Sequence, residues 1–306
     1  MKDNLNIIEV DSRKLFVLGD THGVLSAFQK IMRKEKHQDC NIIHVGDFGA
    51  GFFTDPEFEY YTTIYDDPKN LGLYWKTSID SINWHQQILE ERNIHLYIVR
   101  GNHDNPIWWE NNCELIDKLL KSKGEEGENL VKDGWKNITF VPDYTIIKTT
   151  QRVSEGDHTT IPHNILCIGG AISIDRNHPL CCDKWLQGEA DLKQPPVSLD
   201  KLGLICQELN VRTLITHTAT DFAIQTLGTD FLMSLAKNDV LLLDDVSREH
   251  KLMHDIVMVV KPLKWYFGHY HFKMIGSYQL DGEELTGKFV EYECLQINQS
   301  VEIKNE

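Results

Sequence analysis

The sequence predicts an α/β fold, and two patterns along its 306 residues are the basis of this prediction. In the first half, short β-rich runs alternate with helical patterns, and strands separated by helices pair in parallel through right-handed crossovers. In the second half strands dominate, and two helices interrupt them. Five short polar fragments follow predicted strands, so we expect the functional site at the strand ends.

The first half contains three predicted strands and two predicted helices. The apolar, β-rich runs that indicate buried strands are residues 14–18 (KLFVL), 41–45 (NIIHV) and 95–99 (HLYIV). One helix follows Gly23, because Val24, Phe28 and Met32 fall on one helical face. The other helix is predicted over residues 75–92.

The second half contains further strands around two helices. The predicted strands are residues 138–141, 144–148, 165–168, 213–216, 265–267, 273–280 and 288–296. One helix opens at Ser198 and buries a stripe that includes Leu202 and Cys206. The other begins at about Asp244 and stops at Pro262.

We predict that residues 1–306 form a single domain. Neither a low-complexity linker nor an internal repeat divides the sequence. Four loop excursions interrupt the predicted elements, at about residues 49–73, 121–134, 151–163 and 175–196. Loops of this length in a compact domain are usually functional or mobile.

Charge and composition exclude several classes of protein. The formal net charge of −15 argues against a surface that follows nucleic-acid phosphates over a long distance, because such surfaces are basic. No run approaches the roughly 20 apolar residues that span a membrane, and the first residues lack the apolar run of a signal peptide. The seven cysteines form no Cys-x-x-Cys motif, which is typical of reduced structural thiols. We therefore expect a soluble, cytoplasmic protein with no membrane partner.

The five polar fragments together supply ligands for two adjacent divalent cations. They are residues 19–23 (GDTHG), 46–47 (GD), 101–104 (GNHD), 216–217 (TH) and 268–271 (GHYH). Asp20 and His22 are one residue apart, as are His269 and His271, so each pair points to one side of an extended strand end. Two cations about 3.5–4 Å apart can hold a nucleophilic water between them and clamp phosphate oxygens.

Each fragment alone has a simpler explanation. A lone Gly-Asp, as at Asp47, is commonly a turn or a helix cap. A lone histidine after an apolar run, as at His217, is more often buried in a core. The combination of all five in one chain favours a metal site over these structural alternatives.

In this order the fragments resemble the motifs GD-x-H, GD, GNH-D/E, H and GH-x-H of the calcineurin-like metallophosphoesterase superfamily. The resemblance spans residues 18–271 and implies a four-layer α/β/β/α sandwich of two mostly mixed sheets flanked by helices, with metals at the strand ends. It implies a first metal held by Asp20, His22, Asp47 and His271. It implies a second metal held by Asp47, Asn102, His217 and His269, with Asp47 bridging. Mn²⁺ is the expected ion, and Fe, Zn²⁺ and Ni²⁺ also suit a nitrogen and oxygen ligand set.

The third fragment also provides the expected catalytic residues. His103 resembles the general acid of the superfamily, which protonates the leaving oxygen or stabilises the transferring phosphoryl group. Asp104 resembles the carboxylate beside it, which would fix an imidazole tautomer or order the loop. An alternative for Asp104 is a helix cap, because Asn105 and Pro106 follow it.

The second fragment departs from the superfamily pattern of the protein phosphatases. Their motif GD-x-x-DRG includes an arginine that grips the substrate phosphate, and residues 46–53 (GDFGAGFF) lack both that acid and that arginine. Another segment, with Ser173, Asp175 and Arg176, would leave a strand toward the metals. Arg176 could replace the missing clamp, or the segment could be a turn with a surface ion pair.

We therefore predict a dinuclear-metal-dependent phosphoesterase that uses a hydroxide held between the metals. Its expected substrates are a phosphorylated small molecule, a nucleotide or a phosphoprotein, cleaved as a monoester or a diester. A nuclease acting on DNA or RNA ends is the alternative within the same chemistry. A non-catalytic scaffold is a further alternative, opposed by the presence of every expected ligand.

Overall fold

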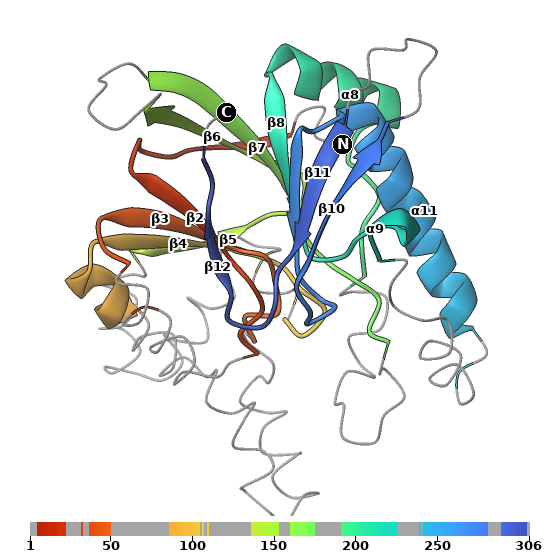
Figure 1. The fold of residues 1–306 in the computed structure, drawn as a ribbon, viewed down its shortest axis with the longest axis horizontal. Coiled ribbons are helices and arrows are strands. Elements are labelled where there is room, and N and C mark those ends of the chain that lie inside the picture. The colour runs from red at the N-terminus through yellow and green to blue at the C-terminus, as the bar shows by residue number, and fades with distance from the viewer. Residues whose placement is uncertain are drawn as a thin grey trace, which may run out of the picture.

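The computed structural model contains two β-sheets with helices on their outer faces (Figure 1). The residues that the structure describes are 5–22, 32, 37–49, 86–104, 106, 109, 136–152, 160–174, 191–224, 239, 241–280 and 289–304. The predicted α/β class with two mixed sheets is confirmed.

The smaller sheet has five strands in the order β12-β2-β3-β4-β5. They are β2 (Lys14–Leu18), β3 (Cys40–His44), β4 (Ile94–Val99), β5 (Ile138–Val141) and β12 (Ser300–Glu302). Strands β2 to β5 pair in parallel, and β12 runs antiparallel to β2. The carboxyl ends of β2, β3 and β4 therefore lie at one edge of this sheet.

The larger sheet has seven strands in the order β1-β6-β7-β8-β9-β11-β10. They are β1 (Asn6–Glu9), β6 (Thr145–Arg152), β7 (Thr160–Ile168), β8 (Val211–Thr216), β9 (Lys264–Phe267), β10 (Met274–Gln279) and β11 (Phe289–Cys294). Strands β7, β8, β9 and β11 are parallel, whereas β6 and β10 run antiparallel to β7 and β11. The carboxyl ends of β8 and β9 are therefore neighbours.

One apolar core lies between the sheets. Alternate residues of each strand face opposite sides of a sheet, and on β2 the inward residues are Leu15 and Val17. They pack with Ile43 of β3 and with Ile165 and Ile215 of the opposite sheet. This shared apolar layer fixes the two sheets face to face, so that their functional edges meet.

Helices cover the outer faces of both sheets. Three of them, α8 (Leu199–Glu208), α9 (Asp221–Ile224) and α11 (Leu242–Val260), lie against the larger sheet (Figure 1). Their apolar side chains pack on outward residues of that sheet such as Leu214 and Trp265. On the smaller sheet, Leu89 of the helical residues 86–91 packs against Ile42 and Leu96.

Local sequence signals set the ends of the two longer helices. Ser198 is the N-cap of α8, and its side chain accepts a hydrogen bond from the backbone N–H of Lys201, as predicted. Helix α11 begins at Leu242, two residues before the predicted Asp244. It ends where Lys261 adopts a left-handed conformation before Pro262.

The structure places each predicted strand at or near its expected residues. The ends differ most in the β6–β7 hairpin, because β6 extends to Arg152 and β7 begins at Thr160, so the loop predicted at 151–163 is shorter. The residues that extend these strands are rich in threonine, which favours strands without an apolar pattern. Strands β1 and β12 and the helix α9 were not predicted, because four or fewer residues carry too little periodicity.

Several predictions fall on residues that the structure does not describe. They include most of the helix after Gly23, the first part of the helix at 75–92, the loop at 121–134 and most of the loops at 49–73 and 175–196. The single-domain organisation stays a prediction. Among the described helices, none has the length and apolar character needed to cross a membrane.

Candidate metal centre

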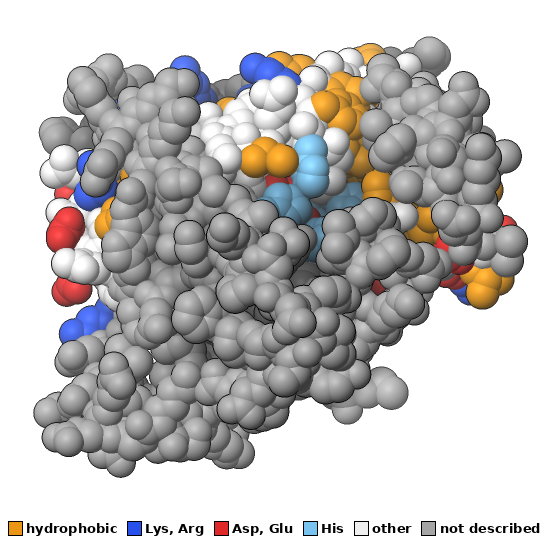
Figure 2. Space-filling model, turned by 90° about the horizontal axis from the view of Figure 1, so that it is seen from below, with side chains coloured by type: hydrophobic (Ala, Val, Ile, Leu, Met, Phe, Trp, Pro, Cys, Tyr) orange, Lys and Arg blue, Asp and Glu red, His pale blue; other side chains and the backbone are white. Residues whose placement is uncertain are grey.

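The predicted ligands come together at the carboxyl ends of five parallel strands. In the smaller sheet β2 leads into Asp20 and His22, β3 leads into Asp47, and β4 leads into Asn102. In the larger sheet β8 leads into His217, and β9 leads into His269 and His271. Histidine side chains gather on this face of the molecule, with acidic atoms between them (Figure 2).

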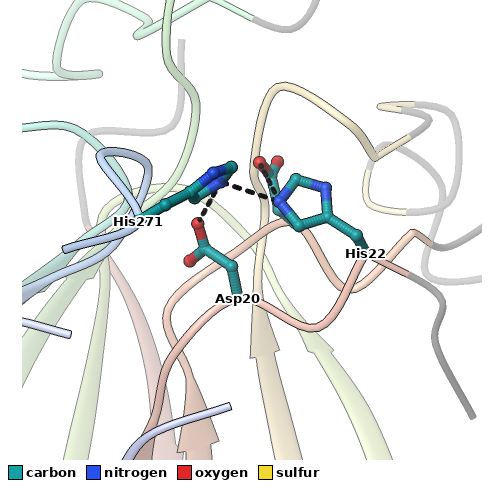
Figure 3. Close-up of side chains that lie close together, drawn as sticks. Asp20, His22 and His271 are labelled. Atoms are coloured by element: carbon teal, nitrogen blue, oxygen red, sulfur yellow. Dashed lines mark hydrogen bonds and ion pairs between the residues drawn. The ribbon is translucent and has the colours of Figure 1, made fainter. Parts of the chain in front are cut away.

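The first cluster contains Asp20, His22, Asp47 and His271, whose ligand atoms all lie within 4.8 Å of one another. The Nε2 atoms of His22 and His271 are 2.8 Å apart, and Asp20 Oδ2 lies 3.3 Å from Nε2 of His271 (Figure 3). The Oδ2 atom of Asp47 lies 3.7 Å from Nε2 of His22. Two ring nitrogens and two carboxylates thus point at one small volume, as ligands of a common ion do.

The second cluster contains Asp47, His217 and His269. The Nε2 atom of His217 lies 3.2 Å from Asp47 Oδ1 and 2.9 Å from Asn102 Oδ1. On the other side of the ring, Nδ1 lies 3.1 Å from the carbonyl oxygen of Val45, which leaves Nδ1–H to donate there. This bond turns Nε2 toward the two side-chain oxygens, the arrangement that a metal-binding histidine requires.

Unsatisfied carboxylate oxygens show that a cation fits this donor set. Asp20 and Asp47 are fully buried, yet Asp20 Oδ1 and Asp47 Oδ2 accept no hydrogen bond from any described residue. A buried carboxylate without compensation is costly, and a bound cation compensates it. Asp47 contributes to both clusters, so it stands where a bridging ligand would be needed.

The backbone at the ligands adopts a conformation that few residue types accept. The φ angles of His22, Asp47, His269 and His271 are 47°, 54°, 68° and 59°, all in the left-handed region. Such conformations cluster at functional sites because the surrounding structure must hold them in place. The glycines beside them leave space, since a Cβ on Gly268 would lie 2.1 Å from Asp20 Oδ1.

Burial and neighbouring charges shift the pKa values of two histidines of the site in opposite directions. Burial lowers the pKa of His269 to about 3, so its ring is neutral and able to bind a metal. Burial also acts on His217, but the charge and hydrogen bond of Asp47 outweigh it and raise the pKa of His217 to about 9. The carboxylates thus favour a positive charge on the His217 ring, and a bound metal ion would supply that charge in place of the proton.

The two predicted catalytic residues lie beside the clusters in different roles. The backbone N–H of His103 donates to Asp47 Oδ1 over 2.7 Å, and its ring centroid is 5.1 Å from that of His22. Asp104 is buried, and its carboxylate accepts hydrogen bonds from the backbone N–H groups of Gly49 and Gly101, at 2.7 and 2.8 Å. Of the three roles considered for Asp104, namely fixing an imidazole tautomer, ordering the loop and capping a helix, these contacts favour ordering of the loops.

Of the three expected substrate-binding residues, the structure describes one. The side-chain amide of Asn102 donates to Ser173 Oγ over 3.0 Å, so Ser173 lies next to the second cluster and orients the amide. Asp175 and Arg176 lie outside the described residues. The arginine clamp therefore stays a prediction.

His44 belongs to the site and was not predicted. It is buried, and its Nδ1 accepts from the backbone N–H of Gly46 over 3.2 Å, while its Nε2 lies 3.1 Å from Thr21 Oγ1. Burial lowers the pKa of His44 to about 3, so the ring stays neutral. It ties together the loops that carry Asp20 and Asp47. The sequence signal was weak because His44 lies inside an apolar run.

The chain was compared with protein families, solved structures and curated proteins, and the family comparison is the one that identifies it. A family model described as calcineurin-like phosphoesterase matches residues 13–271. One solved structure aligns over 91% of this chain and 89% of its own, with 14% identity and a TM-score of 0.41. A protein serine/threonine phosphatase from Saccharomyces cerevisiae with similarity to human phosphatase PP5 aligns over 96% of this chain and 72% of its own, with 16% identity and a TM-score of 0.27. A search of curated proteins found no match.

Proposed function

Because the chain belongs to the calcineurin-like phosphoesterase family of metal-dependent phosphoric ester hydrolases, we propose that it hydrolyses phosphoesters with two divalent metal ions. The observation that carries this proposal is the convergence of two Asp/His clusters on Asp47, with buried carboxylate oxygens that no described residue satisfies.

The two ions would be held by every residue of the two clusters together with Asn102. Asp20, His22, Asp47 and His271 would bind one, and Asp47, Asn102, His217 and His269 the other. When bound, divalent ions lower the pKa of a water nucleophile and neutralise charge on a phosphoryl group. We propose Mn²⁺ for both sites, because a set of imidazole, carboxylate and amide ligands without thiolates suits it; Fe, Zn²⁺ and Ni²⁺ are also compatible.

The protein residues would position the reacting groups and move a proton. His103 is half-buried beside His22, and its backbone is fixed by the 2.7 Å hydrogen bond to Asp47. From there we propose that its imidazole donates a proton to the leaving oxygen of the ester. Asp104 would hold the backbone on both sides of Asp47 still during this transfer.

We propose a phosphorylated small molecule, a nucleotide or a phosphoprotein as the substrate. The net charge of −15 opposes extended contact with nucleic acid, so we do not advance a nuclease as a second function. Arg176 would bind the substrate phosphate, because the segment after Asp47 has no arginine. From the cysteine pattern we also propose that the protein works in a reducing, cytoplasmic environment.

The decisive test combines metal analysis with two model substrates. The full chain is purified, its metal content measured, and its hydrolysis of p-nitrophenyl phosphate and bis-p-nitrophenyl phosphate compared in Mn²⁺. We expect bound metal and chelator-sensitive turnover of at least one substrate. The substrate that is hydrolysed faster indicates whether the enzyme prefers monoesters or diesters. Asp47→Asn purified in parallel controls for a contaminating phosphatase. Absence of metal together with inactivity on both esters would refute the proposal.

A further inference from the structure

A chain of polar side chains, buried at Glu249, Thr218 and His250, lies beneath the loops that follow β7, β8 and β9. It runs from Glu249 on α11 through Thr218, Tyr270 and His250 to Asp221 at the start of α9. None of these residues is a predicted metal ligand. Thr218, however, directly follows His217, and Tyr270 lies between His269 and His271.

Glu249 is the anchor of this chain, and its carboxylate is almost completely buried. Its Oε1 accepts a hydrogen bond from the Thr218 hydroxyl over 2.8 Å, and its Oε2 accepts one from the backbone N–H of Ile172 over 2.7 Å. Only 6% of the residue is exposed. A carboxylate in such a position is costly unless its hydrogen bonds are made, so the loops that supply them are held to it.

The contacts continue from Thr218 toward the second metal-ligating loop. The Thr218 hydroxyl lies 3.2 Å from the Tyr270 hydroxyl, which in turn lies 3.3 Å from Nε2 of His250. The single hydroxyl hydrogen of Thr218 goes to Glu249. The Tyr270 hydroxyl can donate either to Thr218 or to Nε2 of His250. Nδ1 of His250 lies 2.5 Å from Asp221 Oδ1. Each of the two hydroxyl groups therefore lies between two polar partners.

The same carboxylate also reaches the loop that contacts Asn102. Ile172, whose N–H it accepts, directly precedes Ser173, and Ser173 accepts from the amide of Asn102 over 3.0 Å. Glu249 therefore contacts, directly or through one hydroxyl, segments adjacent to His217, to His269 and His271, and to Ser173.

We propose that Glu249 is a positioning residue that holds the metal-ligating loops of the seven-stranded sheet in their binding geometry, through Thr218 and Tyr270. The inference rests on the proposed metal centre. Partners outside the first ring of ligands usually alter metal affinity or activity by about 10–100-fold when they are removed. The expected effect of losing Glu249 is therefore weaker metal binding by a folded protein.

The test measures Mn²⁺ binding to the full chain by titration calorimetry, together with the electron paramagnetic resonance spectrum of the bound ions. Glu249→Ala removes both acceptor oxygens, and we expect it to weaken Mn²⁺ binding by about 10–100-fold and to change the spectrum. Glu249→Gln should restore both, because an amide can accept from Ile172 and donate to Thr218. Asp255→Asn, on the exposed part of the same helix, is the charge-matched control and should behave as wild type.

Two smaller variants keep the test valid if Glu249→Ala does not fold. Thr218→Val and Tyr270→Phe each remove one hydroxyl and keep the shape of the side chain, and each should weaken Mn²⁺ binding. Folded variants with wild-type affinity and spectrum would overturn the inference and leave the metal centre intact. A wild-type chain that binds no divalent ion would overturn the metal centre and the inference together.

Discussion

The two sheets support their predicted metal ligands in different ways. On the five-stranded side, Asp104 lies two residues after Asn102 and accepts hydrogen bonds directly from backbone N–H groups of the ligand loops. On the seven-stranded side, Glu249 lies 31 residues after Thr218 and accepts hydrogen bonds from the Thr218 hydroxyl and from the backbone N–H of Ile172. A carboxylate close in sequence to the ligands can be recognised within a motif, whereas one distant in sequence is recognised only from the fold.

The two clusters also differ in their access to solvent. In the first cluster the side chains of His22 and His271 are 22% and 41% exposed. In the second, His217 is fully buried and 8% of His269 is exposed. Substrate and exchanging ions should therefore approach from the first cluster, while the second depends on the packing around it.

The largest effect should come from the residue that joins the two clusters. Asp47→Asn removes one of the two carboxylate oxygens that face His22 and His217. We expect loss of both ions and a fall of activity by more than about 100-fold, the upper range for residues that only support a ligand. Metal content measured by mass spectrometry checks this result. Retention of two ions per chain would contradict the bridging position.

A large effect without metal loss should come from the five-stranded side. His103→Ala removes the proposed general acid but leaves the backbone N–H that contacts Asp47. We expect kcat to fall by about 10²–10⁴-fold while both ions stay bound. Steady-state kinetics with metal analysis on one preparation provides the measurement. An unchanged kcat would remove His103 from the mechanism.

Asp104 should affect stability more than chemistry. Asp104→Ala leaves the backbone N–H groups of Gly49 and Gly101 without their acceptor. Hydrogen bonds to a charged group are worth about 1.5–3 kcal/mol each, so the free energy of unfolding should fall by about 3 kcal/mol. Denaturant unfolding measures this change. Asp104→Asn keeps one acceptor oxygen and should lose less, and equal stability of all three proteins would contradict the assigned role.

The smallest effect concerns the pH dependence of stability on the seven-stranded side. Burial raises the pKa of Glu249 to about 7, above that of an exposed glutamate. The folded state therefore keeps this proton more tightly, so its stabilising effect is present at low pH and is lost as the pH rises through 7. Between pH 5 and 7 the wild type should lose about 2 kcal/mol of stability relative to Glu249→Gln.

Unfolding curves of both proteins at each pH provide this comparison, because titration of the other groups largely cancels between them. Parallel pH profiles for wild type and Glu249→Gln would show that Glu249 is already ionised at pH 5.

The sequence predicted most of the fold because its strands are short apolar runs with clear ends. The strand at residues 14–18 and the N-cap Ser198 are examples in which local composition alone sets the boundary. Strand β12 was missed because it exists only through pairing with β2, at the far end of the chain. Such pairing leaves no periodic signal in three residues.

The candidate site likewise contains residues that the sequence predicted and residues that it did not. Asp20, Asp47 and the paired histidines lie at strand ends with glycines beside them, so the motifs could be recognised. His44 was not recognised because a buried histidine in a strand resembles ordinary core. Glu249 was not recognised because its partners lie on other elements, and only the fold brings α11 under the ligand loops.

The left-handed backbone at four of the predicted ligand positions restricts how this centre could be redesigned or could diverge. Asparagine, aspartate and histidine are the side chains, apart from glycine, that accept this conformation most readily, and all three are metal ligands. Glutamate and cysteine, which would serve for other metal preferences, are less suited to the φ angles of 47° to 68° found here. The backbone thus limits the set of ligands that can be exchanged before any metal chemistry is considered, and a library of variants at these positions should be confined to those three residues.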